Sequence, residues 1–147
     1  MPLRLSTGLV NKLMDTASFK ATFALGFIDI YTGTQPTSAN DASTGTKLVT
    51  ISVGGTGTGI TFEAAATDGI LEKTASETWQ GTASSGGTAG WFRLREAADA
   101  GTALSTTACR VDGAIATSGA QMNLGSLTVT NGAPFILTAA SFTLPQA

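Results

Sequence analysis

The stretch IDIYTGTQPTSANDASTGTKLVTISV, residues Ile28 to Val53, holds two runs of β-branched and aromatic residues separated by a long loop of small and polar residues. Successive side chains in a strand point to opposite faces, so Val49, Ile51 and Val53 predict one apolar face in the second run. β-branched and aromatic residues favour strands, whereas Gly, Pro, Asn and Asp favour turns. The stretch therefore predicts two strands joined by a loop that leaves the sheet.

The first of these two runs presents two different faces. Ile28 and Ile30 form the cleaner apolar side, and Asp29 and Tyr31 lie on the other side. We therefore predict that the isoleucines face the core, that Asp29 contacts water and that Tyr31 is partly exposed.

The segment TAGWFRL, residues 88–94, is the clearest strand signal further along the chain. Trp91 and Arg93 are expected on one face together with Arg95, and Phe92 on the other. Asp68-Gly69 and Asn131-Gly132 are turn signals of the kind that joins antiparallel strands. Short strands at this spacing predict an all-β fold, an antiparallel β-sandwich or jelly-roll-like architecture. The predicted strands are 25–31, 47–53, 60–64, two short strands within 70–84, 91–95, 109–115, 122–124 with 127–129, 135–139 and 141–144.

One segment near the start of the chain has helical rather than strand periodicity. Four apolar residues between Leu9 and Met14 recur at helical spacing. We predict one short N-terminal helix or arm within residues 1–20, followed by a single β-sandwich domain over residues 21–147. An isolated apolar stripe needs something to cover it, so this arm is expected to reach a partner.

The composition is unusually poor in charge. Charged residues make up 12% of the 147 residues, about half the usual share, and the net charge is −2. Lysines and arginines form no basic stripe, so we expect no nucleic-acid binding. The longest apolar run is far shorter than the roughly 20 residues that span a bilayer, so we expect no membrane contact. The start of the chain shows no signal-peptide pattern, which predicts assembly in the cytoplasm.

The residue types needed for common catalytic sites are missing. The chain contains no histidine and a single cysteine, Cys109, which we expect to be a buried structural thiol. A Ser-His-Asp or Cys-His site cannot be built, and zinc sites made of His or several Cys are excluded. The glycine-rich segment 54–59 lacks the spacing and the strand–loop–helix context of a phosphate-binding loop. We therefore expect no enzymatic activity, no cofactor and no metal.

Several motifs together resemble one family. These are YTGTQP at 31–36, GTKL at 45–48, TAGWFR at 88–93 and GAIATSGAQMNL at 113–124. They are similar to motifs of small structural proteins encoded among tailed-bacteriophage head genes. The resemblance implies a capsid decoration, or cement, protein on the capsid surface of the virion, assembled in the cytoplasm of the bacterial host. Its implied partners are a further copy of itself, as homodimer or homotrimer, and the major capsid protein.

Two alternatives remain open at this stage. One is a tail or neck component of the phage particle: a tube, fibre or connector. The other is a carbohydrate-binding β-sandwich module that stacks sugars on Trp79, Trp91 and Tyr31.

The residues proposed to contact a partner come from the N-terminal stripe, the loop after Tyr31 and the strand around Trp91. Arg93 and Arg95 would pair with a neighbouring subunit, or else lie on a water-facing side with Trp91 at a sheet edge. The loop at 37–46 is long enough to reach a neighbour, although it could equally be an idle connection. The full set is Leu9, Leu13, Tyr31, Gln35, Pro36, Asn40, Asp41, Trp91, Arg93 and Arg95.

Overall fold

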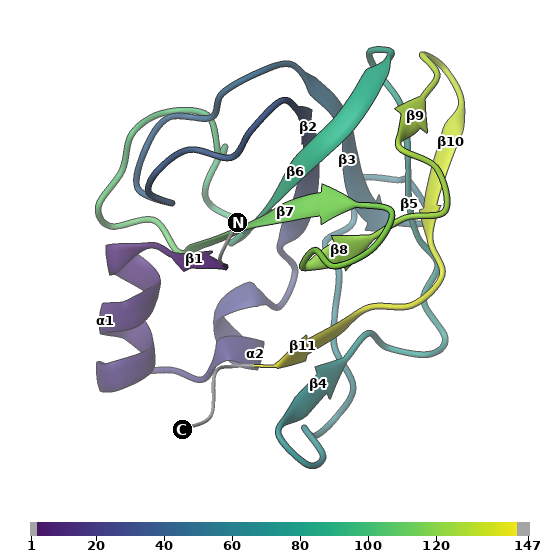
Figure 1. Cartoon of the computed structure of the whole chain (residues 1–147). Helices are drawn as coiled ribbons and strands as arrows, with labels where there is room; N and C mark the ends of the chain where they lie inside the picture. Colours follow the sequence, from purple (N-terminus) through teal and green to yellow (C-terminus); the bar gives the residue numbers. More distant parts are fainter. Residues whose placement is uncertain (1–2, 144–147) are drawn as a thin grey trace.

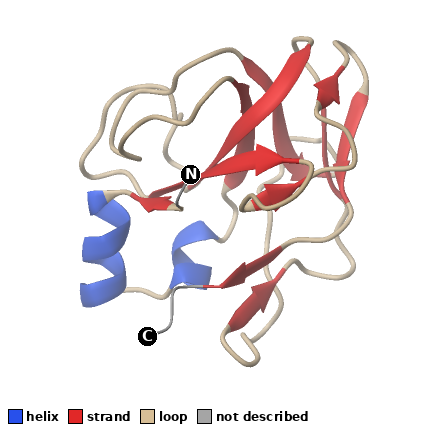
Figure 2. Cartoon of the chain, viewed as in Figure 1, coloured by secondary structure: helices blue, strands red, loops and turns tan. Residues whose placement is uncertain are grey.

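A computed structural model describes residues 3–143, and most of the regular structure in that part is antiparallel strand (Figure 1, Figure 2). Two helices, α1 (Thr7–Asp15) and α2 (Phe19–Phe23), lie near the N-terminus. The prediction of an all-β, mainly antiparallel chain is confirmed. The strands are β1 (Arg4–Leu5), β2 (Phe27–Thr32), β3 (Lys47–Val53), β4 (Ile70–Glu72), β5 (Trp79–Thr82), β6 (Gly87–Arg95), β7 (Arg110–Ala116), β8 (Met122–Asn123), β9 (Thr128–Val129), β10 (Pro134–Leu137) and β11 (Ser141–Thr143).

The main sheet of the described residues is curled rather than flat. Its strand order is β1-β7-β6-β2-β3-β5-β10, and β9 pairs with the N-terminal end of β6. The turn Asn131-Gly132, with Gly132 at φ +81°, joins β9 to β10 and so connects two parts of the sheet that are distant in strand order. β11 pairs with β4 in a separate two-stranded ladder at the lower end of Figure 1.

Most of the predicted strands are present and one is not, and the strand β1 and the helix α2 were not predicted. β3 has the predicted bounds, but the expected strand at 60–64 makes only isolated bridges, from Ile60 and Phe62. The sequence analysis missed α2, which the Ser18 side chain caps by accepting a hydrogen bond from the Ala21 N–H. The last predicted strand is present as β11, and its final residue, Leu144, lies outside the described residues.

The apolar core lies against one face of the central strands. Ile28 of β2 is opposite Ile51 of β3 on one side and Leu94 of β6 on the other, and all three are buried. Trp79 is also fully buried in this core, where its ring meets Phe62 edge-on. The expectation that the isoleucines of β2 face the core is confirmed.

The N-terminal segment packs onto the sheet. β1 pairs with β7, with Arg4 opposite Asp112, and the Leu9 side chain of α1 is fully buried. The predicted free apolar stripe is therefore covered largely by the chain itself, because Leu9 and Leu13 contact the core. Only Val10 and Met14 of that stripe face solvent.

We predict that the substitution Gly8→Ala destabilises the protein. A β-carbon at Gly8 would lie 2.3 Å from the main-chain oxygen of Thr107, so overpacking should cost about 1–3 kcal/mol. In a helix that did not contact the loop, alanine would instead stabilise by about 1 kcal/mol. Urea unfolding measures the sign, and the exposed Asn11→Ala in the same helix serves as control. Stabilisation by Gly8→Ala would contradict the docking of α1.

Candidate functional site

The second face of the central sheet carries charged and aromatic side chains, and it is buried as well. A row of residues crosses the sheet in register: Thr50 of β3, Asp29 of β2, Arg93 of β6 and Asp112 of β7. Asp29, Arg93 and Asp112 are each 0% exposed. The prediction that Asp29 contacts water is therefore wrong, because the loops 33–46 and 96–109 cover this face.

Arg93 and Asp112 form the central ion pair. The Nε and Nη2 atoms of Arg93 donate to the two carboxylate oxygens of Asp112, both at 2.7 Å. Burial raises the pKa of Asp112, and the Arg93 guanidinium opposes this rise. Arg93 also donates to the main-chain oxygens of Gly101 at 2.7 Å and Asp41 at 3.1 Å. The Arg93 side chain thus links β6 to β7 and to both covering loops.

Arg95, two residues further along β6 and on the same face, makes a similar set of contacts. Its Nε donates to the Asp29 carboxylate at 2.7 Å and its Nη1 to the Asp99 main-chain oxygen at 2.6 Å. The Thr50 hydroxyl donates to the other oxygen of Asp29 at 2.6 Å. A β-carbon at Gly101 would lie 2.7 Å from the Arg95 side chain, so the loop needs glycine there.

Arg110 of β7 binds the side chain of Asp99 in the second loop. Its Nε and Nη2 donate to the two carboxylate oxygens at 2.6 and 2.8 Å. Desolvation raises the pKa of Asp99, but hydrogen bonds from Arg110 and from the Gly101 N–H outweigh it and hold the pKa below its ordinary value of 3.8. This pairing fixes the loop 96–109 against the end of the sheet.

Tyr31 and Trp91 extend the buried polar face toward the first loop. Their rings stack with centroids 4.4 Å apart, and the indole N–H of Trp91 donates to the main-chain oxygen of Thr44. Burial, and then the nearby Asp29 carboxylate, raises the pKa of Tyr31. Tyr31 is 2% exposed and Trp91 is 0% exposed, so the prediction of a partly exposed Tyr31 is wrong. No sugar could stack on Tyr31, Trp91 or Trp79, because all three rings are buried.

The two loops also bind each other, and we call residues 33–46 and 96–109 together the loop platform. The Ser43 N–H donates to the Thr102 oxygen at 3.1 Å, and the Ser105 N–H donates to the Asn40 oxygen at 2.8 Å. The Asn40 side chain accepts from the N–H of Thr7 and donates to its hydroxyl, which joins α1 to the platform. Figure 1 shows the two loops side by side at the upper left.

The predicted contact residues lie mostly beneath the surface, with Leu9 and Leu13 at the apolar core and the others on the polar side of the sheet or in its covering loops. The positions Leu9, Tyr31, Gln35, Pro36, Trp91, Arg93 and Arg95 are buried, and Leu13, Asn40 and Asp41 are half-buried. The predicted roles of Arg93 and Arg95, at an interface or on a water-facing side, are therefore wrong, because both pair with aspartates of the same chain. On the loop platform, the sequence analysis missed the apolar residue Leu104, which is 68% exposed. Nothing in its local sequence distinguishes it.

No group of three or more Asp, Glu or Cys side chains in residues 3–143 is placed to hold a metal ion. Burial raises the pKa of Cys109, and the neighbouring Glu96 raises it further, which disfavours the reactive thiolate. In the same range, no helix is long and apolar enough to cross a bilayer.

Comparisons of the chain with protein-family models, curated proteins and solved structures gave no match. The resemblance to phage head proteins therefore stays a prediction from the sequence motifs.

We predict that Arg93→Met destabilises the fold by about 3–5 kcal/mol, because it leaves the Asp112 carboxylate buried without a partner. The double variant Arg93→Met/Asp112→Leu should recover part of that loss, since it removes both charges but not the need of the Gly101 and Asp41 oxygens for the Arg93 donors. Urea unfolding measures both values. Lys12→Met removes a partly exposed pair with Glu96 and should change stability by no more than about 1 kcal/mol. A double variant as unstable as the single one would contradict this account.

We predict that Asp99→Asn makes the protein less sensitive to acid. A carboxyl whose folded pKa is lowered contributes stability above its ordinary pKa, and the contribution is lost as the pH falls through the lowered value. The wild-type free energy of unfolding should therefore fall more steeply than that of the variant below about pH 4. Urea unfolding between neutral and acidic pH measures the difference. Asp15→Asn, at an exposed position of α1, is the control, and parallel slopes for Asp99→Asn and wild type would refute the prediction.

Proposed function

We propose that this chain is a structural protein of a bacteriophage particle: a capsid decoration protein that oligomerises and strengthens contacts between major capsid subunits. The proposal keeps the β-sandwich or jelly-roll-like architecture predicted from the sequence, and the burial of both faces of β2 and β6 supports a layered packing. The motif resemblance supplies the phage context, and the loop platform supplies the physical argument.

The observation that carries the proposal is the composition of the platform surface. Every exposed residue in the two loops is Gly, Ala, Thr or Leu, although Asp41, Glu96 and Asp99 lie in the same segments, turned inward or half-buried. Burying small side chains costs little conformational entropy, and an uncharged surface loses little solvation when it is covered. The ion pairs below hold the main chain of both loops, so little further ordering is needed on binding. These properties suit a surface that adheres to a protein shell.

A tail or neck component would use the same adhesive surface. The number of copies per particle distinguishes it from a capsid decoration protein. Hundreds of copies per particle indicate a shell component, whereas a few or a few dozen indicate the tail. The carbohydrate-binding alternative loses its support, because the aromatic rings that it requires are buried.

We expect purified wild-type chain to co-sediment with particles of the encoding phage that lack it. The double variant Ala42→Asp/Leu104→Asp should bind these particles about tenfold more weakly or worse, because it places charges on the platform. The control is Ile70→Asp, an exposed apolar position on β4 at the far end of the molecule from the platform (Figure 1). Unchanged binding of the platform variant, or no binding of the wild-type chain, would refute the proposal.

A further inference from the structure

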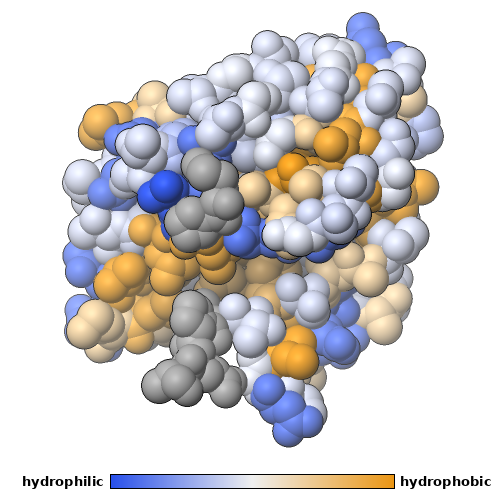
Figure 3. Space-filling view, viewed as in Figure 1, coloured by the Kyte–Doolittle hydropathy of each residue, from blue (hydrophilic) through white to orange (hydrophobic). Residues whose placement is uncertain are grey.

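A groove of about 440 Å³ lies between β8 and β11, away from the loop platform. Its floor is the apolar core face of the sheet, reached at Ile28, Phe92 and Val111. Its two sides are formed by the consecutive residues 121–124 and 139–143. Because consecutive residues line both sides, the main chain of each segment borders the groove. Figure 3 shows apolar side chains at the surface in this region.

Both flanking strands have one edge without a strand partner in the part of the chain that the structure describes. β8 pairs only with β7, and β11 pairs only with β4. An unpaired strand edge presents N–H and C=O groups that can form a ladder with an added strand. A strand inside a packed sheet takes roughly 160 Å³ per residue, so the groove has room for about three residues.

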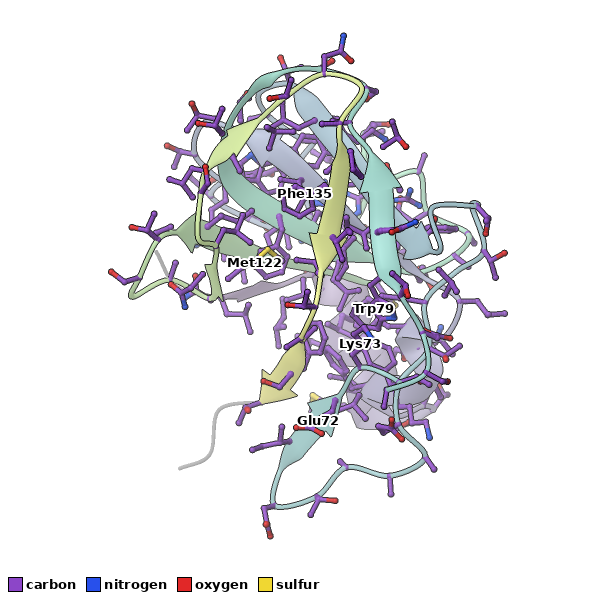
Figure 4. The ribbon with its side chains drawn as sticks, turned by 90° about the vertical axis from the view of Figure 1, so that its right-hand side faces the viewer. Glu72, Lys73, Trp79, Met122 and Phe135 are labelled. Carbon is purple, nitrogen blue, oxygen red and sulfur yellow. The ribbon has the colours of Figure 1, made fainter. Side chains whose placement is uncertain are left out.

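Among the residues that the structure describes, the groove is lined by no charged side chain. The fifteen of them around it are apolar or neutral, and Met122, Leu124 and Phe142 contribute apolar side chains to its sides. Figure 4 shows Met122 on one side of the segment that runs from β10 to β11, with Glu72 and Lys73 on the other side. A charged occupant would lose its solvation here without gaining a partner, so the groove is complementary to an uncharged segment.

We propose that this groove binds an extended, uncharged segment of a partner protein, which adds as a strand between β8 and β11 and places apolar side chains over Ile28, Phe92 and Val111. The main-chain edges supply affinity, and the apolar floor selects a segment with an apolar residue at alternate positions. If that segment belongs to the major capsid protein, the assignment rests on the function proposed above. The argument that the groove binds an extended, uncharged segment does not rest on that function.

The test uses the full chain labelled with ¹⁵N and the capped peptide acetyl-Thr-Val-Thr-Leu-Thr-Val-amide. Binding should shift the amide signals of residues 121–124 and 139–143 and slow their hydrogen exchange. The matched peptide acetyl-Pro-Val-Pro-Leu-Pro-Val-amide keeps the apolar side chains but lacks half of the main-chain donors, so it should bind about tenfold more weakly or worse. This comparison needs only the wild-type chain and is independent of any variant's folding.

A pair of matched variants locates the site on the protein. Met122→Asp places a charge in the groove and should weaken binding of the threonine peptide by about tenfold or more. Met14→Asp makes the same change on the exposed face of α1 and should leave binding unchanged.

Three results would overturn the proposal: no binding of the threonine peptide, equal binding of the two peptides, or signal shifts confined to other surfaces. Concentration-dependent shifts of residues 121–124 and 139–143 without peptide would also overturn it, because a second copy of the chain would then occupy the groove. If the peptide experiment overturns the groove proposal, the prediction that the platform binds particles still stands, so the two proposals fail separately.

Discussion

The bidentate pair of Arg93 and Asp112 is the interaction on which the arrangement of the loops depends. It lies in the middle of the sheet, where water cannot reach it, and each group would be costly to bury alone. The remaining donors of Arg93 reach the main chain of both covering loops. A buried ion pair is weak evidence for stability, but here it determines where two otherwise irregular segments lie.

The ion pairs beneath the loops also explain how a chain so poor in charge acquires an even more neutral surface. Three arginines and three aspartates form these pairs: Asp29, Arg93, Arg95, Asp99, Arg110 and Asp112. Their charges cancel in pairs under the loops, and the exposed parts of those loops contain only small or apolar uncharged residues. Low surface charge and a preformed main chain are the two properties that favour adhesion over solvation.

The two surfaces proposed for binding differ in their physical basis. The loop platform is a closed surface whose backbone groups already bind one another and the arginines below it. The groove between β8 and β11 is a gap between two strands that do not pair with each other, and their unpaired edges lie above the apolar core. The first would recognise a partner by shape, and the second by completing a sheet, so one molecule could bind two neighbours at once.

The local sequence determined most of the strands and their faces. β-branched alternation gives the bounds of β3, and Trp91, Arg93 and Arg95 do share one face of β6, because side-chain direction follows from backbone period alone. The local sequence could not reveal whether that face was exposed to solvent. Arg93 finds Asp112 19 residues away, and Arg95 finds Asp29 66 residues away, so the pairing depends on which strands become neighbours. The same long-range packing buries Leu9, opens the groove and leaves Leu104 exposed, since each of these depends on contacts that no local pattern encodes.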